Sequence, residues 1–227
     1  MTEIQIGPVH EVRILDRSDP LQREMFEELR YFYWVIKHGW APAPADPASK
    51  REGDAYDPFA IHFGLFAPGG VLVGYSRIVL GGGGKRLHLC AKFGLGRLPH
   101  RLNRAVEISR MIVTDDVPRG VARKIGSVLL YRSMYQWAKL HDRPYWYIEA
   151  ERWYIEGLRA QGFPFRELPV PPQVDDKDVT TFAAVLDLAD AEAMMFSINP
   201  EGAAWFVEGL PEDIAIRQPR PALKVAS

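Results

Sequence analysis

Apolar residues recur at helical spacing near the start of the chain and then change to strand-like alternation. Ser18 or Asp19 followed by Pro20 predicts a helix start, because Pro fits the first turn and a short polar side chain caps free N–H groups. From Leu21 the apolar positions keep helical spacing and end near Gly39. A Pro/Ala-rich loop follows over 41–48. Alternating apolar residues over 61–65 and 71–80, joined by a Pro-Gly-Gly turn, predict a β-hairpin.

The second half of the chain alternates between strand and helix patterns. We expect a strand over 105–113, a helix over about 121–141, a strand over 145–150, a helix over 152–161 and a strand over 180–188. The stretch over 81–104 has no clear period. Several prolines follow residue 188 and leave room for a short helix or two.

This order of elements predicts an α/β fold with a mixed central sheet and helices on both faces. The hairpin supplies antiparallel strands, whereas the strand–helix–strand crossover supplies a parallel pair. The same order is typical of acyltransferases with the N-acetyltransferase (GNAT-like) fold, although fold analogy alone does not establish function. We expect a single domain over 1–190 and a partly helical or flexible extension over 191–227.

Length and composition narrow the class of protein. The chain has 227 residues, of which 47% are hydrophobic and 25% charged, as is ordinary for a soluble globular domain. A single cysteine, Cys90, excludes an internal disulfide framework and a multi-cysteine metal site. Neither a secretory signal pattern nor an apolar run of about 20 residues is present. We therefore expect a cytoplasmic protein without a membrane span.

The net charge of −1 conceals an uneven distribution. Over 85–110 there are seven basic residues and one acid, whereas over 167–213 there are eleven acids and one base. The balanced total and the lack of a recognisable binding module argue against a nucleic-acid partner. The basic stretch is a candidate docking surface for an acidic partner.

Several tempting motifs carry little chemistry. The glycines over 81–84 precede Lys85, but the phosphate-loop spacing is missing and Arg86 stands where Ser or Thr would bind magnesium. The six histidines form no ligand pair at helical spacing, so we expect no metal. A single cysteine such as Cys90 is more often a small buried apolar residue than a nucleophile. The Arg/Gly-rich turn over 119–126 opens a helix. Anion binding and simple packing of small residues remain equally good interpretations of it.

Charged residues inside strands are the more informative signal. Arg77, Glu107 and Arg110 lie in otherwise apolar strands, where charges are rarely buried unless paired. Three acids, Glu52, Asp54 and Asp57, cluster in the preceding loop. Arg30 and Trp34 share a helix face because they lie four residues apart, and Trp40 follows that helix. Two of the loop acids together with Arg77, Glu107 and Arg110 predict a buried ion network, and charge pattern alone favours a purely structural one.

In order along the chain, these residues resemble the signature of acyl-homoserine-lactone synthases, the autoinducer synthases of bacterial quorum sensing. The matching pieces are Leu29-Arg30-x-x-x-Trp34 with Gly39-Trp40, Asp54-Ala55-Tyr56-Asp57, Arg77, and Glu107-Ile108-Ser109-Arg110-Met111-Ile112-Val113. The resemblance covers roughly 20–190. Trp34 and Met111 depart from it, since both positions are usually Phe. Tyr56 and His62 lean towards the sister N-acyl amino acid synthases.

The resemblance implies a reaction and a role for each residue. An acyl group would pass from an acyl carrier protein or acyl-CoA to the amine of S-adenosylmethionine. Lactone closure would then release methylthioadenosine, and no prosthetic group is needed. Glu107 would be the base and Ser109 would lie near the oxyanion donors, while Arg77 and Arg110 would hold Glu107 and the loop acids. The implied S-adenosylmethionine pocket comprises Arg30, Trp34, Trp40, Asp54 and Asp57. In an ideal strand Glu107 and Arg110 point to opposite faces, so a bulge must re-aim one of them or Arg110 serves elsewhere.

Three further expectations complete the hypothesis. The basic stretch, with Lys92, Arg97, Arg101 and Arg104, would dock an acidic acyl carrier protein. The acyl chain would lie against 145–148 and the long helix. An N-acyl amino acid synthase, or a non-catalytic acyl-carrier-binding module, remains an alternative to the lactone synthase. The sequence does not distinguish acyl length, donor type or oligomeric state.

Overall fold

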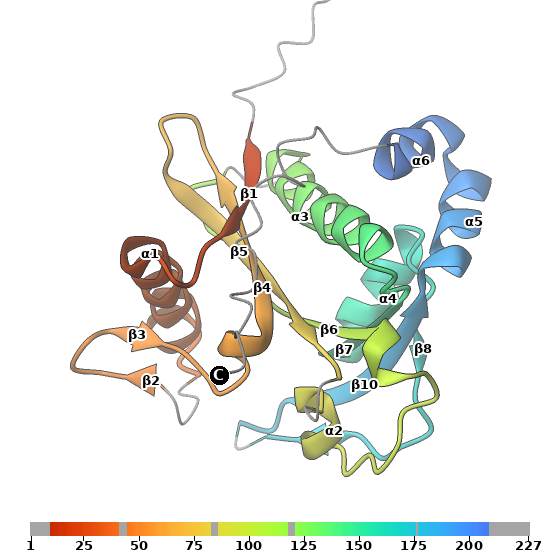
Figure 1. Cartoon of the computed structure of the whole chain (residues 1–227), viewed down its shortest axis with the longest axis horizontal. Helices are drawn as coiled ribbons and strands as arrows, with labels where there is room; N and C mark the ends of the chain where they lie inside the picture. Colours follow the sequence, from red (N-terminus) through yellow and green to blue (C-terminus); the bar gives the residue numbers. More distant parts are fainter. Residues whose placement is uncertain (1–9, 41–44, 83–85, 118–120, 176, 209–227) are drawn as a thin grey trace, which may run out of the picture.

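The computed structural model describes residues 10–40, 45–82, 86–117, 121–175 and 177–208, which form one large mixed sheet with helices on both faces (Figure 1). In spatial order the strands are β1 (Glu11–Leu15), β4 (Ala60–Phe66), β5 (Leu72–Leu80), β6 (Ala105–Val113), β7 (Tyr145–Ala150), β10 (Thr180–Asp187) and β8 (Arg166–Glu167), and β9 (Gln173–Val174) also pairs with β10. Within the described sheet only β6 and β7 run parallel. The predicted fold class is confirmed.

The first helix differs from its prediction halfway along. It begins as expected, since Asp19 accepts a hydrogen bond from the Leu21 N–H at 2.9 Å and caps α1 (Pro20–Arg30). The continuation, η1 (Tyr31–Lys37), is a π-helix. Apolar periodicity does not distinguish an α-turn from a π-turn, so the pattern predicted one continuous helix. Such wide turns are frequent at functional sites.

The regions with weak periodicity contain short elements. The predicted loop over 41–48 includes β2 (Ala45–Asp46), which pairs with β3 (Arg51–Glu52), and η2 (Asp57–Phe59) follows. The stretch over 81–104 contains α2 (His88–Lys92) and η3 (Leu102–Arg104). Strand β1 was not predicted. Elements this short leave too few residues for a repeating pattern.

The predicted crossover is present, and the helices around it form one layer. A parallel pair, β6 and β7, is joined through α3 (Val121–Leu140), and α4 (Arg152–Ala160) leads on towards β8. At the end lie α5 (Leu188–Ile198) and α6 (Pro200–Val207), whose Met195 and Phe206 are buried in the main core. The division at residue 190 stays a prediction, and this position falls inside α5.

The two faces of the sheet have separate cores. On the α3 side, sheet residues such as Phe63, Ile78 and Trp146 pack with α3–α6. On the opposite side the cover has two parts, namely α1 with Phe26 against Tyr75, and α2 with Leu89 beside residues of β7 and β10. Figure 1 shows α1 and α2 well apart, with the loop that follows β3 lying near α1. The candidate site lies between these two parts of the cover.

The parallel strands β6 and β7 pair over a short length only. Their register runs from Ala105 opposite Tyr145 to Glu107 opposite Tyr147 and includes no later residues, although both strands continue. Backbone groups of the two strands beyond this point therefore lack each other as ladder partners. A sheet that opens in this way offers main-chain hydrogen-bonding groups to a ligand.

Two helical glycines provide a matched test of the packing. At Gly126 in α3 a Cβ would approach Leu65 Cδ2 to 2.9 Å, whereas at Gly157 in α4 it would meet nothing within 4 Å. We expect Gly126→Ala to lower the free energy of unfolding by about 1–3 kcal/mol through overpacking. Gly157→Ala should raise it by up to about 1 kcal/mol through lost unfolded-state entropy. Urea unfolding measures both, and equal effects of the two substitutions would contradict the close approach of α3 to the sheet.

Candidate active site

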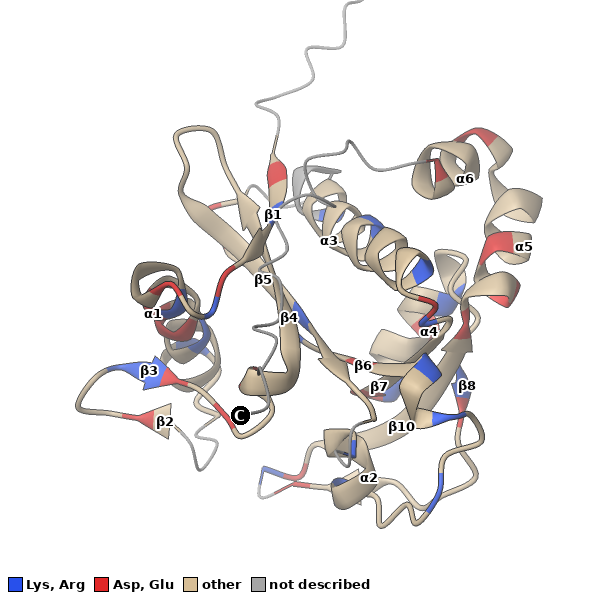
Figure 2. Ribbon diagram, in the orientation of Figure 1, with Lys and Arg blue, Asp and Glu red and all other residues tan. Residues whose placement is uncertain are grey.

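A cluster of three arginines and three carboxylates fills the space between α1, the loop after β3, and strands β5 and β6. Figure 2 shows acidic and basic segments side by side where α1 and β3 meet. We call it the arginine–carboxylate cluster, and its members are Arg30, Glu52, Asp54, Asp57, Arg77 and Arg110. Its formal charge is balanced. The structure thus brings together the loop acids and arginines named from the sequence.

Two of the arginines lie at the centre of the cluster. Arg30 is fully buried and donates from Nε to Glu52 and from Nη1 to Asp57 at 2.7 Å. Arg77, 1% exposed, donates two hydrogen bonds of 2.6 and 2.7 Å to Asp54 and also binds Asp57. Paired guanidinium–carboxylate contacts of this kind are among the strongest in proteins. Asp57 therefore joins Arg30 to Arg77.

Arg110 reaches the cluster through a bulge in β6. Ser109 pairs with Arg77 and Ile112 with Tyr75, so the bulged strand places two residues opposite Ser76. Arg110 takes a left-handed φ of 59°, and its Nη2 lies 3.1 Å from Glu52 Oε1 and 3.4 Å from Asp54 Oδ2. A bulge was one of the two alternatives left open from the sequence. It is present and turns Arg110 towards the loop acids, away from Glu107. Because a left-handed φ strains a non-glycine residue, the ion pairs help to hold it.

The arginines keep the buried carboxyls ionised. Burial raises the pKa of each carboxyl, but the guanidinium partners outweigh it. Arg30 leads in lowering the pKa of Glu52 below its ordinary value, and Arg77 does so for Asp54. For Asp57 the charges of Arg30 and Arg77 prevail in the same direction. All three carboxyls are therefore charged at neutral pH.

A buried histidine supports the cluster from the sheet. His62, on β4, stacks on Phe26 at 4.5 Å between ring centroids, and its Nδ1 lies 2.7 Å from the Tyr75 hydroxyl. Its Nε2 lies 3.1 Å from the Asp57 carbonyl oxygen. Burial, assisted by the nearby arginines, lowers the pKa of His62 to about 4. His62 is therefore neutral in the folded chain at neutral pH.

Two tryptophans form an aromatic wall beside Arg110. The rings of Trp34 and Trp40 meet edge to face at 5.5 Å, and the Arg110 guanidinium lies 4.8 Å from the Trp40 ring centroid. The backbone N–H of Trp40 donates to the Trp34 carbonyl at 2.8 Å, which holds Trp40 next to the end of η1. The Trp34 Nε1 is buried and has no hydrogen-bond partner among the described residues. The two indoles, both partly exposed, therefore border the cluster next to Arg110.

Glu107 lies apart from the cluster, contrary to the expected contacts with Arg77 and Arg110. Its carboxylate is buried, and Oε2 accepts the Leu89 N–H at 3.0 Å. The His88 imidazole lies beside it, with Nδ1 3.7 Å from Glu107 Oε1. The expectation was wrong because helix α2 lies over Glu107. The apolar pattern of the sequence did not predict this helix.

Ser109 stands between Glu107 and the cluster. It lies two residues from Glu107 on the same strand face, and its Oγ accepts a hydrogen bond from Arg77 Nε at 2.9 Å. Ser109, Arg110 and Met111 are partly exposed, whereas their neighbours in β6 are buried. The bulge is therefore where the strand reaches the surface of the site.

The residues expected to line an acyl slot are divided between the faces of the sheet. Trp146 and Ile148 are buried in the core on the α3 side. On the other face, Tyr145 stacks on His100 at 3.7 Å and the Tyr147 hydroxyl lies 2.8 Å from His100 Nδ1. These four side chains do not line a single slot, because successive strand residues alternate.

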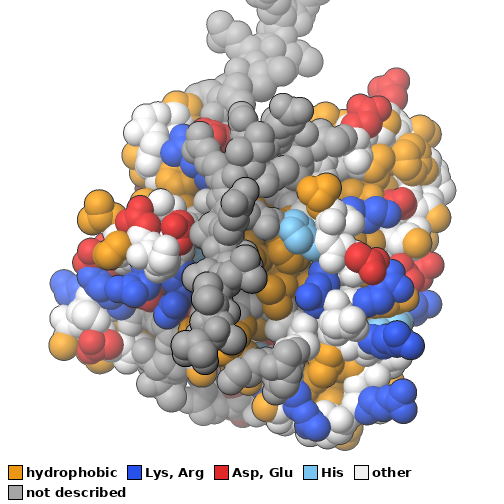
Figure 3. Space-filling view, in the orientation of Figure 1, with side chains coloured by type: hydrophobic (Ala, Val, Ile, Leu, Met, Phe, Trp, Pro, Cys, Tyr) orange, Lys and Arg blue, Asp and Glu red, His pale blue; other side chains and the backbone are white. Residues whose placement is uncertain are grey.

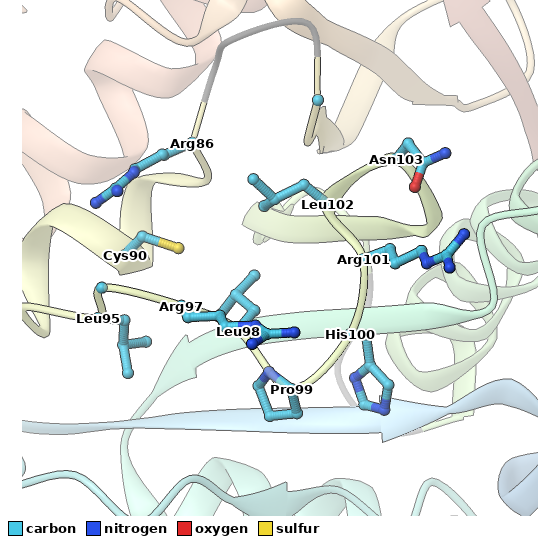
Figure 4. A pocket seen from close by; sticks show the side chains of 12 residues that line it. Arg86, Cys90, Leu95, Arg97, Leu98, Pro99, His100, Arg101, Leu102 and Asn103 are labelled. Atoms are coloured by element: carbon cyan, nitrogen blue, oxygen red, sulfur yellow. The ribbon is translucent and has the colours of Figure 1, made fainter.

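The basic stretch borders a separate pocket of about 520 Å³ between α2 and η3. The pocket is lined by Cys90, Leu98 and Leu102 together with Arg86, Arg97 and Arg101. In Figure 4 the side chains of Arg86 and Arg101 extend outward on opposite sides of it. Figure 3 shows basic side chains gathered on this side of the molecule. No member of the arginine–carboxylate cluster lines this pocket.

Of the four basic residues expected to dock a partner, two are engaged within the chain. Lys92 binds Glu149, and Arg104 binds Asp142 at 2.7 Å. Arg97 and Arg101 are exposed at the pocket. Of these four basic residues, Arg97 and Arg101 are therefore the better candidates for the expected docking surface.

Other features of the described chain limit the possibilities. Across the described ranges no group of three or more His, Cys, Asp and Glu side chains is arranged to hold a metal ion. No helix in these ranges is long and apolar enough to cross a membrane. In the turn over 119–126, residues 119 and 120 lie outside the described residues, so neither interpretation of it is tested. Gly126 itself packs tightly on Leu65.

The fold is shared with solved acyl-homoserine lactone synthases. LasI, an acyl-homoserine lactone synthase, aligns with a TM-score of 0.67 over 84% of this chain and 96% of its own, at 15% identity. BjaI, a CoA-dependent acyl-homoserine lactone synthase solved with SAM and isopentyl-CoA, aligns at 0.63 over 83% and 90%, at 19% identity. The resemblance predicted from the sequence is therefore confirmed for the fold.

A solved N-acyl amino acid synthase also shares the fold. FeeM, an N-acyl amino acid synthase from uncultured soil microbes, aligns with a TM-score of 0.58 over 86% of this chain and 98% of its own, at 18% identity. No protein-family model and no curated protein matches the sequence. At these identities the comparisons show the fold.

The buried titratable groups predict a two-stage loss of stability in acid. His62 has a folded-state pKa of about 4 against an ordinary value of 6.5, so the unfolded chain binds a proton that the folded chain resists. The free energy of unfolding should fall by about 3 kcal/mol between pH 7 and pH 4 from this group. Below about pH 4 the lowered pKa values of the cluster carboxyls should extend the loss.

Urea unfolding between pH 7 and pH 3 measures this dependence. His62→Gln should flatten the upper stage, whereas His38→Gln, at an exposed position, should retain it. A stability unchanged between pH 7 and pH 4 in the wild type would contradict the neutral, buried state of His62.

Proposed function

We propose that the chain is an acyl-homoserine-lactone synthase. The observation that carries the proposal is the buried carboxylate of Glu107, which lies at the point where β6 and β7 separate. Strand β6 also carries Arg110, a member of the charge-balanced cluster beside the aromatic wall. A strand opening suits an extended thioester, and a carboxylate at its apex suits removal of a proton from an amine. The shared fold with LasI and BjaI supports this assignment.

The proposed reaction has two bond-forming steps. The amine of S-adenosylmethionine attacks the thioester carbonyl of an acyl-CoA or an acylated carrier protein, forming an amide and releasing the thiol. The carboxylate of the same substrate then attacks its own γ-carbon and expels methylthioadenosine, which closes the lactone. The net release of one proton balances the steps. S-adenosylmethionine is a substrate here, and the proposal requires no prosthetic group.

Glu107 is the proposed base. An α-amino group has a pKa of about 8, so most of it is protonated at neutral pH and cannot attack. A carboxylate within hydrogen-bond reach, directly or through one water, removes that proton as the bond forms. Glu107 suits the task because the Leu89 N–H fixes its Oε2, and Oε1 is the proposed proton acceptor.

The cluster and the aromatic wall are the proposed S-adenosylmethionine site. The sulfonium is attracted to an aromatic face, a contribution of about 2 kcal/mol when water is excluded, and Trp34 or Trp40 supplies such a face. The sequence argument gave Asp54 and Asp57 the task of meeting positive charge, but both are already bound by arginines. Arg110, the most exposed cluster arginine, is the proposed partner of the substrate carboxylate.

The donor is proposed to enter at the opening between β6 and β7. Main-chain N–H groups of β6 around the bulge are the proposed oxyanion donors, next to Ser109. The exposed arginines at the pocket, Arg97 and Arg101, are the proposed docking surface for an acidic carrier protein. With CoA and carrier-bound substrates in view, the expected compartment is the cytoplasm.

One measurement separates this function from its alternatives. A lactone synthase releases methylthioadenosine together with the free thiol. An N-acyl amino acid synthase, the activity of FeeM, releases the thiol alone. A non-catalytic carrier-binding module releases neither. The purified chain should therefore be incubated with S-adenosylmethionine, a mixture of amino acids and an acyl-CoA or acylated carrier protein, and methylthioadenosine and free thiol should both be quantified.

Glu107→Gln tests the base with little change in shape. We expect wild-type turnover to release methylthioadenosine and thiol in equal amounts, and the substitution to lower kcat by about 10²–10⁴-fold. The Kd for S-adenosylmethionine should change less than twofold, because the cluster does not contact Glu107. Near-normal turnover of Glu107→Gln would remove Glu107 as the base. Thiol release without methylthioadenosine would replace the lactone synthase by the amino acid acyltransferase.

Charge reversal at the pocket tests the docking surface. Arg97→Glu with Arg101→Glu should lower kcat/KM for an acylated carrier protein by at least tenfold at low salt, and added salt should shrink the difference. The matched control reverses Lys50 and Lys139, which are exposed elsewhere, and should leave kcat/KM unchanged. If the arginine reversal has no more effect than the control, the carrier protein docks on another surface.

A further inference from the structure

In the proposed reaction Glu107 takes a proton from the amine, and this proton must then leave the buried carboxyl. Its side chain is 2% exposed, so a proton taken from the amine has no direct route to bulk water. A base must lose its proton before the next turnover. One carboxylate oxygen is occupied by the Leu89 N–H, so the proton has to leave through Oε1.

His88 stands beside that oxygen. Its Nδ1 lies 3.7 Å from Glu107 Oε1, a separation that one water or a small side-chain movement closes. The imidazole is 40% exposed, and it is therefore the group that touches both the buried carboxylate and solvent. His88 is the first residue of α2, the helix that covers Glu107.

Groups from every neighbouring element surround the imidazole. Glu107 faces it from β6, and Glu149 Oε2 from β7 lies 4.0 Å from the same Nδ1. Lys92, one turn further along α2, binds Glu149 and offsets its charge. From the loop before η2, the Tyr56 ring meets the imidazole edge to face at 5.1 Å. Glu107 and Glu149 both face Nδ1, so the imidazolium that forms when His88 accepts a proton lies beside negative charge.

The other titratable neighbours of Glu107 are poor acceptors. Burial raises the pKa of the Cys90 thiol, and so does the Glu107 charge. Burial and the same charge raise the pKa of Tyr56. Both groups are therefore already protonated and neutral at neutral pH, and neither can accept a further proton. This leaves His88 as the acceptor that the geometry supports.

We propose that His88 is a positioning and proton-relay residue that carries the proton of Glu107 to solvent. The proposal rests on the proposed function. The substrate ammonium gives a proton to the Glu107 carboxylate, and the carboxyl passes it to His88 Nδ1. The imidazolium formed then releases one proton to water. Histidine suits this role because its ordinary pKa lies near neutrality.

His88→Gln with imidazole rescue tests the relay. Glutamine keeps a polar group at this position but cannot carry a proton. We expect kcat for thiol release to fall about tenfold at pH 7 with KM for both substrates unchanged, and to recover as free imidazole is added. Wild-type kcat should not respond to imidazole. His141→Gln, at the end of α3, should behave like wild type.

A measurement without turnover reports on the contact itself. In NMR of the full chain, the side-chain resonance of His88 should change its chemical shift in Glu107→Gln, because the carboxylate 3.7 Å from Nδ1 is gone. The Glu149→Gln variant should shift it less, since Lys92 already offsets Glu149.

The outcomes separate the two proposals. An active wild type whose His88→Gln variant keeps full kcat, or loses it without response to imidazole, overturns the relay alone. A His88 resonance unaffected by Glu107→Gln also overturns it. A wild-type chain that acylates no amine overturns the proposed function and the relay together.

Discussion

The structure of the site depends on the mutual compensation of buried guanidiniums and carboxylates. Charges out of water are tolerated only when paired, and removing one partner typically costs about 3–5 kcal/mol. Because Arg30, Asp57 and Arg77 come from α1, η2 and β5, pairing them fixes how these elements meet. Arg110 adds β6, and the bulge with its left-handed φ follows from the need to bring this side chain to Glu52. Such clusters specify an arrangement more than they add stability.

The same compensation divides the site into two chemically different parts. Within the cluster every carboxylate is held ionised and occupied by arginine, so none is available as a base. Glu107 stays apart from the arginines because α2 covers it and Ser109 lies between it and Arg77. Under the proposed function, the cluster would orient a zwitterionic substrate while the separate carboxylate exchanges a proton. The opening between β6 and β7 begins at this carboxylate, and the donor is proposed to enter there.

Long periodic elements were predictable from the sequence, and contacts made through short ones were not. Strand β7, helix α3 and the β4–β5 hairpin follow their patterns closely, because each buries one face over many residues. The cluster was also foreseeable, since charges in apolar strands demand partners. The π-turns of η1, strand β1 and helix α2 left no periodic trace. The contact of Glu107 with His88 was missed for that reason, and so was the separation of Glu107 from the arginines.

A crystal structure of the full chain with S-adenosylmethionine tests the central claim most directly. The account predicts the sulfonium against Trp34 or Trp40, the substrate carboxylate on Arg110, and the amine nitrogen within one water of Glu107 Oε1. The arginine–carboxylate cluster should be unchanged from the free chain. A ligand bound away from the aromatic wall, or one whose amine points away from Glu107, would contradict the account.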